Sequence, residues 1–175
     1  MLTAYLRLYF NLLLLRAGPQ DIPYSRSLTW LTLMLAFLVS LTGGALIYSP
    51  SRNLVLNLLD MALLLLFLDL ILRVTGKHSR FMQTVAAVCG AETLLQLLGL
   101  PSYWLITGDR QEAYTDPAVM LALWYSLLLL VYSILVLTHI VRHALSTNML
   151  NAVLVTLAYS IASVMLIDAV VPAKN

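Results

Sequence analysis

Acidic and amide side chains recur at helical spacing in two strongly apolar stretches of this sequence. Asn53, Asn57 and Asp60 follow one another at intervals of four and three residues, which places them on one face of a helix. Glu92 and Gln96 form a similar pair in the next apolar stretch. Two carboxylates that face each other in a medium of low dielectric constant resist ionising together, so at least one is expected to hold its proton at neutral pH. Such a pair could relay protons or bind a cation.

The same residues could instead have a purely structural role. A protonated Glu92 that donates to Asn57 or Gln96 would be ordinary polar contact between helices, worth on average about 0.6 kcal/mol. This role is favoured because no lysine or arginine is expected at the same depth to form a charge-coupled pathway. His139, near the end of a later apolar stretch, is a further titratable group. The candidate intramembrane polar site is therefore Asn57, Asp60, Glu92, Gln96 and His139.

A helical hairpin around the basic turn 73–80 has to position the two acids. If two antiparallel helices fold about Gly76 and Lys77, each rising about 1.5 Å per residue, residues at equal depth have numbers that add up to about 153. Asp60 then lies level with Glu92, about 10 Å in from the far end of its helix at Asn53 and inside the hydrocarbon region of a bilayer.

We expect the other reactive side chains to have structural roles. Asp69 lies four residues before Arg73, so the two can pair on one helix face. Cys89 is the only cysteine and is expected to be a small packing residue. His139 and His143 lack further ligands nearby, so no metal or other cofactor is expected. No phosphate-binding glycine loop, Gly-x-Ser-x-Gly or His-Glu-x-x-His motif occurs, which argues against an enzyme.

The composition indicates the environment of the chain. Of 175 residues, 61% are hydrophobic and 10% are charged, whereas soluble domains carry about 25% charged residues. We therefore predict an all-α, polytopic integral membrane protein that contacts membrane lipids. The net charge of +2 is too small to suggest a nucleic-acid partner.

Five apolar stretches are long enough to cross a bilayer, which takes about 20 residues of helix. They are residues 28–47, 54–72, 81–100, 118–140 and 150–171. Pro50 is expected to end the first span, and Gly99 with Pro101 the third. Residues 103–117 then form a polar loop. The whole chain, 1–175, is predicted to be a single membrane domain.

Residues 1–17 are too short to span a bilayer and carry one polar stripe, which includes Arg7. We predict an amphipathic helix at the cytoplasmic membrane interface, with Tyr5, Tyr9 and Phe10 at the level of the lipid headgroups. The alternative is that this segment packs against the bundle as an additional core helix.

Residues 18–26 form a linker, because Gly18, Pro19 and a second proline prevent a continuous helix. Asp21 or Ser25 can cap the helix that follows. The linker could be a docking element for a partner, and a plain turn between helices is the alternative that such clusters form more often.

The distribution of basic residues predicts the orientation. If the amino terminus is cytoplasmic, the basic residues on the inside are Arg7, Arg16, Arg26, Arg73, Lys77, Arg80 and Arg142, and those on the outside are Arg52, Arg110 and Lys174. Cytoplasmic segments carry the excess of lysine and arginine. The amino terminus is therefore expected in the cytoplasm and the carboxyl terminus outside, with a bacterial inner membrane as the expected location.

The topology resembles a known family. Five spans, the Gly18-Pro19 pair in a cytoplasmic amino-terminal segment and very little extramembrane mass resemble the Yip-type family, five-span proteins that associate in eukaryotes with Rab-type GTPases in membrane traffic. Segments 18–25 and 80–84 are also similar to small proteobacterial inner-membrane proteins of unknown function. The resemblance implies a five-span fold and no catalytic residue.

Two functions follow from these patterns. The first is a non-catalytic protein that binds other integral membrane proteins, as an accessory subunit or assembly factor of an inner-membrane complex, with a second copy of the chain as another candidate partner. Its predicted partner contacts are Arg7, Gly18, Pro19, Asp21, Gly43, Gly44, Ala86 and Gly90, in part because small residues let helices approach closely. The alternative is a small proton- or cation-conducting transporter or channel subunit that uses Asp60 and Glu92.

Overall fold

The computed structural model describes residues 2–106 and 116–172, and these residues form helices without any strand. The elements in order are α1 (Leu2–Leu13), η1 (Pro19–Asp21), α2 (Arg26–Ala45), α3 (Pro50–Val74), η2 (His78–Arg80), α4 (Phe81–Ile106), α5 (Pro117–Leu145) and α6 (Met149–Val170). Helices α2 to α6 are long and apolar enough to cross a membrane. The charged residues Asp109, Arg110 and Glu112 of the predicted polar loop lie outside the described residues.

The helices begin at capping residues and prolines that can be recognised in the sequence. The Ser25 hydroxyl accepts a hydrogen bond from the Leu28 N–H at 3.3 Å, which confirms Ser25 as the cap of α2. Asp116 caps α5 in the same way, at 2.9 Å. Pro50 is in the first turn of α3 and does not end the preceding helix. Proline suits this position because it lacks an N–H, and the N–H groups of a first turn have no acceptor within the helix.

Helix α4 continues beyond Gly99 and Pro101, where the sequence predicted its end. The Ser102 hydroxyl donates to the Gly99 carbonyl at 2.7 Å, and the Tyr125 hydroxyl of α5 donates to the Leu98 carbonyl at 3.1 Å. Pro101 has no N–H to donate to the Leu97 carbonyl, and proline is tolerated inside apolar helices where side chains and neighbouring helices support the backbone around it. The prediction failed because it considered the proline without its neighbours.

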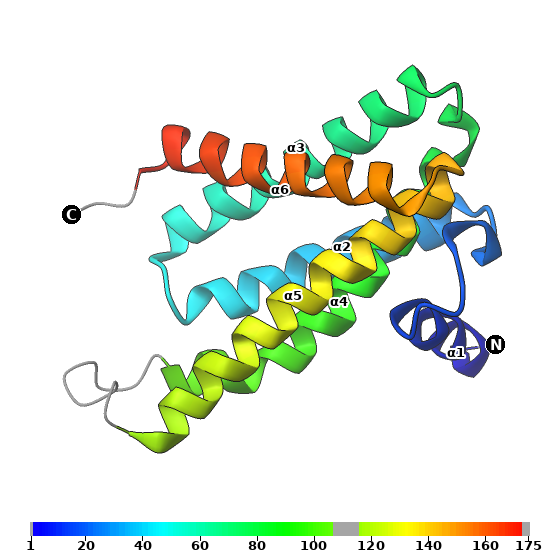
Figure 1. The fold of residues 1–175 in the computed structure, drawn as a ribbon. Helices are drawn as coiled ribbons and strands as arrows, with labels where there is room; N and C mark the ends of the chain where they lie inside the picture. The colour runs from blue at the N-terminus through cyan, green and yellow to red at the C-terminus, as the bar shows by residue number, and fades with distance from the viewer. Residues whose placement is uncertain (1, 107–115, 173–175) are drawn as a thin grey trace.

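Helix α4 lies at the centre of the arrangement and contacts α1, α2, α3 and α5, while α6 packs on α3 and α5. Figure 1 shows the amino terminus, the α3–α4 turn and the α5–α6 turn at one end, here called the amino-terminal end. The α2–α3 turn and the end of α6 lie at the other, the carboxyl-terminal end. Arg52 ties that end together by donating to the Pro172 carbonyl at 3.1 Å.

The outer faces of the helices are strongly apolar. Leu66, Leu121, Trp124 and Leu150 are each between 65% and 72% exposed. By contrast, 61% of the most apolar stretch of α4 is buried, against 11–22% in the other four long helices. Extensive apolar surface around one buried central helix is what a lipid environment accommodates and water does not.

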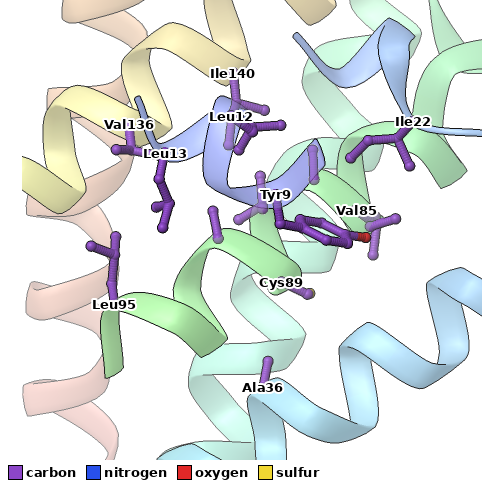
Figure 2. Close-up of a cluster of buried hydrophobic side chains, with 14 of the residues drawn as sticks. Tyr9, Leu12, Leu13, Ile22, Ala36, Val85, Cys89, Leu95, Val136 and Ile140 are labelled. Carbon is purple, nitrogen blue, oxygen red and sulfur yellow. The ribbon is translucent and has the colours of Figure 1, made fainter. Parts of the chain in front are cut away.

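The amino-terminal helix α1 packs into the core. Tyr9, Leu12 and Leu13 are buried in one cluster with residues of α4 and α5 (Figure 2). The Tyr9 ring covers Gly90, which lies nine residues and about 14 Å from the start of α4 at Phe81. A tyrosine at that depth differs from the expected ring at headgroup level, and it matches the alternative of a helix packed against the bundle. Phe10, the next residue, points away from this cluster and is 53% exposed.

Candidate functional site

The polar stripe of α3 begins with two asparagines that anchor the helix. The Asn53 side-chain amide is buried against α2 and donates to the Leu41 carbonyl at 2.8 Å. Gly44 makes this contact feasible, because a Cβ atom there would lie 2.0 Å from Asn53 Oδ1. One turn further on, Asn57 Nδ2 donates to Asn53 Oδ1 at 2.7 Å. These contacts fix the rotation of α3, and the same face then presents Asp60.

Asp60 and Glu92 line the same two cavities, as the hairpin geometry predicted. The two carboxyl groups are close enough for their charges to interact. Among the described residues, neither carboxyl group has a hydrogen bond or an ion pair. Two such groups from different helices, both open to cavity space, can share or exchange a proton or bind a cation.

Three adjoining cavities surround Asp60. The end cavity, of about 440 Å³, lies mainly between α2, α3 and α4, with Asn57, Asp60 and Gln96 in its walls. The middle cavity, of about 240 Å³, also includes Gln96 and adds Glu92. The deep cavity, of about 360 Å³, extends between α4, α5 and α6. Ligand pockets typically enclose about 300–1,000 Å³, so the two larger cavities have the size of a binding site.

Helices α5 and α6 contribute hydroxyl groups to these walls. The hydroxyl-bearing residues are Ser126 and Ser133 of α5 and Tyr159, Ser160 and Ser163 of α6. Ser126 and Ser133 did not appear among the predicted site residues, although their spacing of seven, two helical turns, could have indicated a shared face. Hydroxyls can both donate and accept, so they suit a hydrated site.

The cavities extend along much of α4 but not along all of it. Their lining residues on this helix run from Val88 to Tyr103, about 22 Å of a hydrocarbon region about 30 Å thick. The wall of the end cavity reaches the exposed Tyr48 beyond the end of α2. Toward the amino-terminal end, Leu72 and Val141 are buried in an apolar cluster between the helices. The site is thus closed on one side by tightly packed hydrophobic residues.

The observed contacts argue against a purely structural role for Glu92. Asn57 Nδ2 donates to Asn53, to both its carbonyl and its side chain, and within the described residues Asn57 Oδ1 accepts no bond from Glu92. Gln96 Oε1 is buried and has no hydrogen-bond partner in the described part of the chain. Because neither amide bonds to Glu92, the expected polar contact between helices is not formed here.

His139 is not part of the acidic site. Its Nε2 lies 2.9 Å from the Ala17 carbonyl, and its ring lies 4.4 Å from that of His143. On the same face of α5, the Tyr132 hydroxyl donates to the Leu13 carbonyl at 2.5 Å. His139 was grouped with the acids because it can titrate, but it lies on the face of α5 that holds the amino-terminal segment.

The small residues expected to contact a partner are used within the chain. A Cβ on Gly90 would lie 2.2 Å from the Tyr9 ring, and Gly44 is covered by Asn53. Gly43 is buried beside Leu100, and Ala86 is 1% exposed. A partner that used these positions would first have to displace residues of the chain itself.

The linker also folds onto the bundle. Gly18 donates to the Asp21 carboxylate at 2.7 Å, and Pro19 is buried. Gln83 of α4 donates to the Ile22 carbonyl at 2.7 Å. Of the predicted partner contacts, Arg7 and Asp21 keep exposed side chains, and for them the partner role stays a prediction.

The remaining predicted groups have structural surroundings. The Asp69–Arg73 pair is confirmed at 2.7 Å, and His78 joins it at 2.9 Å from the other carboxylate oxygen. Cys89 is fully buried. The described residues contain no group of three or more His, Cys, Asp or Glu side chains that could hold a metal ion.

Together, the fold and the site define an all-helical chain with five helices suited to span a membrane and an acid-lined cavity between them. The chain matches no protein-family model, no curated protein and no solved structure. The likeness to Yip-type proteins therefore stays a prediction from topology.

Proposed function

We propose that this protein is a small proton- or cation-conducting transporter or channel subunit, with Asp60 and Glu92 as the groups that bind the proton or cation. The observation that carries the proposal is that these two carboxyl groups, from different helices, line the same two cavities without a partner among the described residues. This was the alternative function predicted from the sequence.

Physical chemistry supports a functional role for the two acids. Carboxyl groups at membrane depth are costly unless they are paired, protonated or hydrated. Asp60 lies ten residues, about 15 Å, into α3, and its side chain is exposed to the adjoining cavities. The serine hydroxyls of α5 and α6 donate to carbonyls of their own helices, and their oxygens remain able to coordinate a bound cation.

The predicted orientation of the chain determines which side of the membrane the site faces. With the amino terminus in the cytoplasm of a bacterial cell, the end cavity lies toward the outside and the Leu72 cluster lies toward the cytoplasmic side. Conduction then requires this cluster to separate, as in proteins whose hydrophobic constrictions act as gates.

Flux measurements in liposomes test the proposal. The purified protein is reconstituted with a pH-sensitive dye inside, and a potassium diffusion potential drives proton entry, with Na⁺ and K⁺ gradients as parallel assays. Asp60→Asn combined with Glu92→Gln should reduce flux to the level of protein-free liposomes, because neither amide can ionise.

Asp69→Asn is the matched control, since it removes a carboxylate from the same helix but outside the cavities. It should leave the flux close to that of the wild type. Absence of flux in the wild type for all three ions, or unchanged flux in the double variant, would refute conduction through these acids.

An accessory subunit remains the second candidate, and the exposure of Asp60 favours it. A helix from another membrane protein could place a lysine or arginine beside this carboxylate. A gentle-detergent purification from the native membrane, followed by mass spectrometry, should then give a stoichiometric partner that Asp60→Asn releases. Recovery of the chain alone, together with flux, would exclude this candidate.

A further inference from the structure

A second polar cavity lies at the amino-terminal end of the bundle, away from the acids. It has a volume of about 380 Å³ and adjoins the turn between α5 and α6. Its walls are formed by Gln20, Arg80, Arg142, His143, Ser146 and Thr147. Every one of these side chains can donate a hydrogen bond, and no carboxylate is among them.

Arg80 is held in place by the end of α5. Its Nη1 donates to the carbonyls of His143 and Ala144, both at 3.2 Å, and to the Ser146 hydroxyl at 2.9 Å. No other nitrogen of Arg80 has an acceptor among the described residues. The guanidinium group is therefore fixed by one edge, while its remaining N–H groups stay available to an anion.

Arg142 supplies a second, uncommitted positive charge. It is exposed and has no hydrogen bond or ion pair within the described part of the chain. Asp21 is the acid near enough to interact with His143, but its carboxylate accepts from the Gly18 N–H at 2.7 Å and does not line the cavity. The field in the cavity is thus positive.

The turn itself adds neutral donors. Ser146 has a left-handed backbone conformation, with φ of 47°, which ends α5. The Thr147 hydroxyl follows directly in the cavity wall. One guanidinium group held in place (Arg80), a second that is free to approach (Arg142) and two hydroxyls match the charge and the hydrogen-bonding needs of a phosphate group.

We propose that this cavity binds a phosphate group, carried by an anionic phospholipid headgroup or present as free phosphate. Basic pockets between helix ends are known to bind lipid headgroups at the cytoplasmic face of membranes. The site is separate from the acid-lined cavities, and the proposal does not depend on conduction.

Binding is measured with the full-length protein in a zwitterionic detergent, from the shift of the thermal unfolding midpoint. The probes are inorganic phosphate and short-chain phosphatidylglycerol, with phosphatidylcholine as the neutral reference. Saturable stabilisation by phosphatidylglycerol beyond that of phosphate would assign a lipid headgroup, and equal stabilisation by both would assign the phosphate group alone. Either result supports the site.

The matched variants are Arg142→Gln and Arg26→Gln, because both remove an exposed charge at the same end and only the first lies in the cavity. Arg142→Gln should weaken binding about fivefold, and Thr147→Val should also weaken it, while Arg26→Gln should not. Arg80→Gln is avoided because it would uncap α5. Stabilisation by neither anion, or equal weakening by both arginine variants, would overturn the proposal.

Discussion

The two halves of α4 lie in opposite surroundings. From Thr84 to Ala91 every residue is buried, and Tyr9 of α1 fills the space above Gly90. From Glu92 onward the helix carries the polar residues that line the cavities, Glu92, Gln96 and Ser102. The first half stabilises the fold, and the second half is free to carry a polar site. Stability and function should therefore respond to different substitutions.

The largest effect is expected from Tyr9→Ala in the closed half. Removing a buried aromatic ring should lower the free energy of unfolding by about 3–5 kcal/mol. Unfolding can be followed by titrating SDS into mixed micelles. Phe10→Ala is the control, because that ring is 53% exposed and its loss should have little effect in the same titration. Equal effects of the two substitutions would mean that α1 is not docked as described.

Gly90→Ala should follow, with a loss of about 1–3 kcal/mol from overpacking. The added Cβ would lie 2.2 Å from the Tyr9 ring, so one of the two must move. In the Tyr9→Ala background the same methyl group finds room, and its effect should largely disappear. A double-mutant cycle measures this coupling, and additive effects would contradict the contact.

Tyr9→Phe should stabilise the protein by about 1 kcal/mol at neutral pH, because the Tyr9 hydroxyl is buried without a hydrogen-bond partner among the described residues. Burial raises the pKa of Tyr9 from its ordinary value of 10.0 to about 12. The folded protein then keeps a proton that the unfolded chain loses, so stability should fall as the pH rises from 10 to 12. Tyr9→Phe should lose less stability over this interval than the wild type.

The smallest effects on stability are expected in the cavity half. Asp60→Asn and Glu92→Gln remove no packed contact, so each should change the free energy of unfolding by less than about 1 kcal/mol. The same SDS titration measures both variants. A loss comparable to that of Gly90→Ala would show that the carboxyl groups support the fold, contrary to the difference between the halves.

The level of the acids could be predicted from sequence because depth depends on little more than the rise of a helix. Counting from the turn at Gly76 placed Asp60 level with Glu92, and the two line the same cavities. The five long helices followed from hydropathy in the same way.

The rotation of each helix about its axis could not be predicted, because it depends on the neighbours. His139 was therefore assigned to the acidic site although it faces the amino-terminal segment, and Ser133 was missed. Gly90 and Gly44 were read as surfaces for a partner, since a small residue indicates a close contact without saying whether the other side belongs to the same chain.

Cysteine accessibility tests the central claim most directly. A membrane-impermeant, positively charged methanethiosulfonate reagent is applied to either face of the reconstituted protein, with Cys89, which is fully buried, as the internal unreactive reference. Ser133→Cys, in the middle and deep cavities, should be modified from the outer face only. Leu72→Cys, in the apolar cluster, should stay unmodified from both faces. If Ser133→Cys is as unreactive as Cys89, the acids are not in a hydrated cavity and the account is wrong.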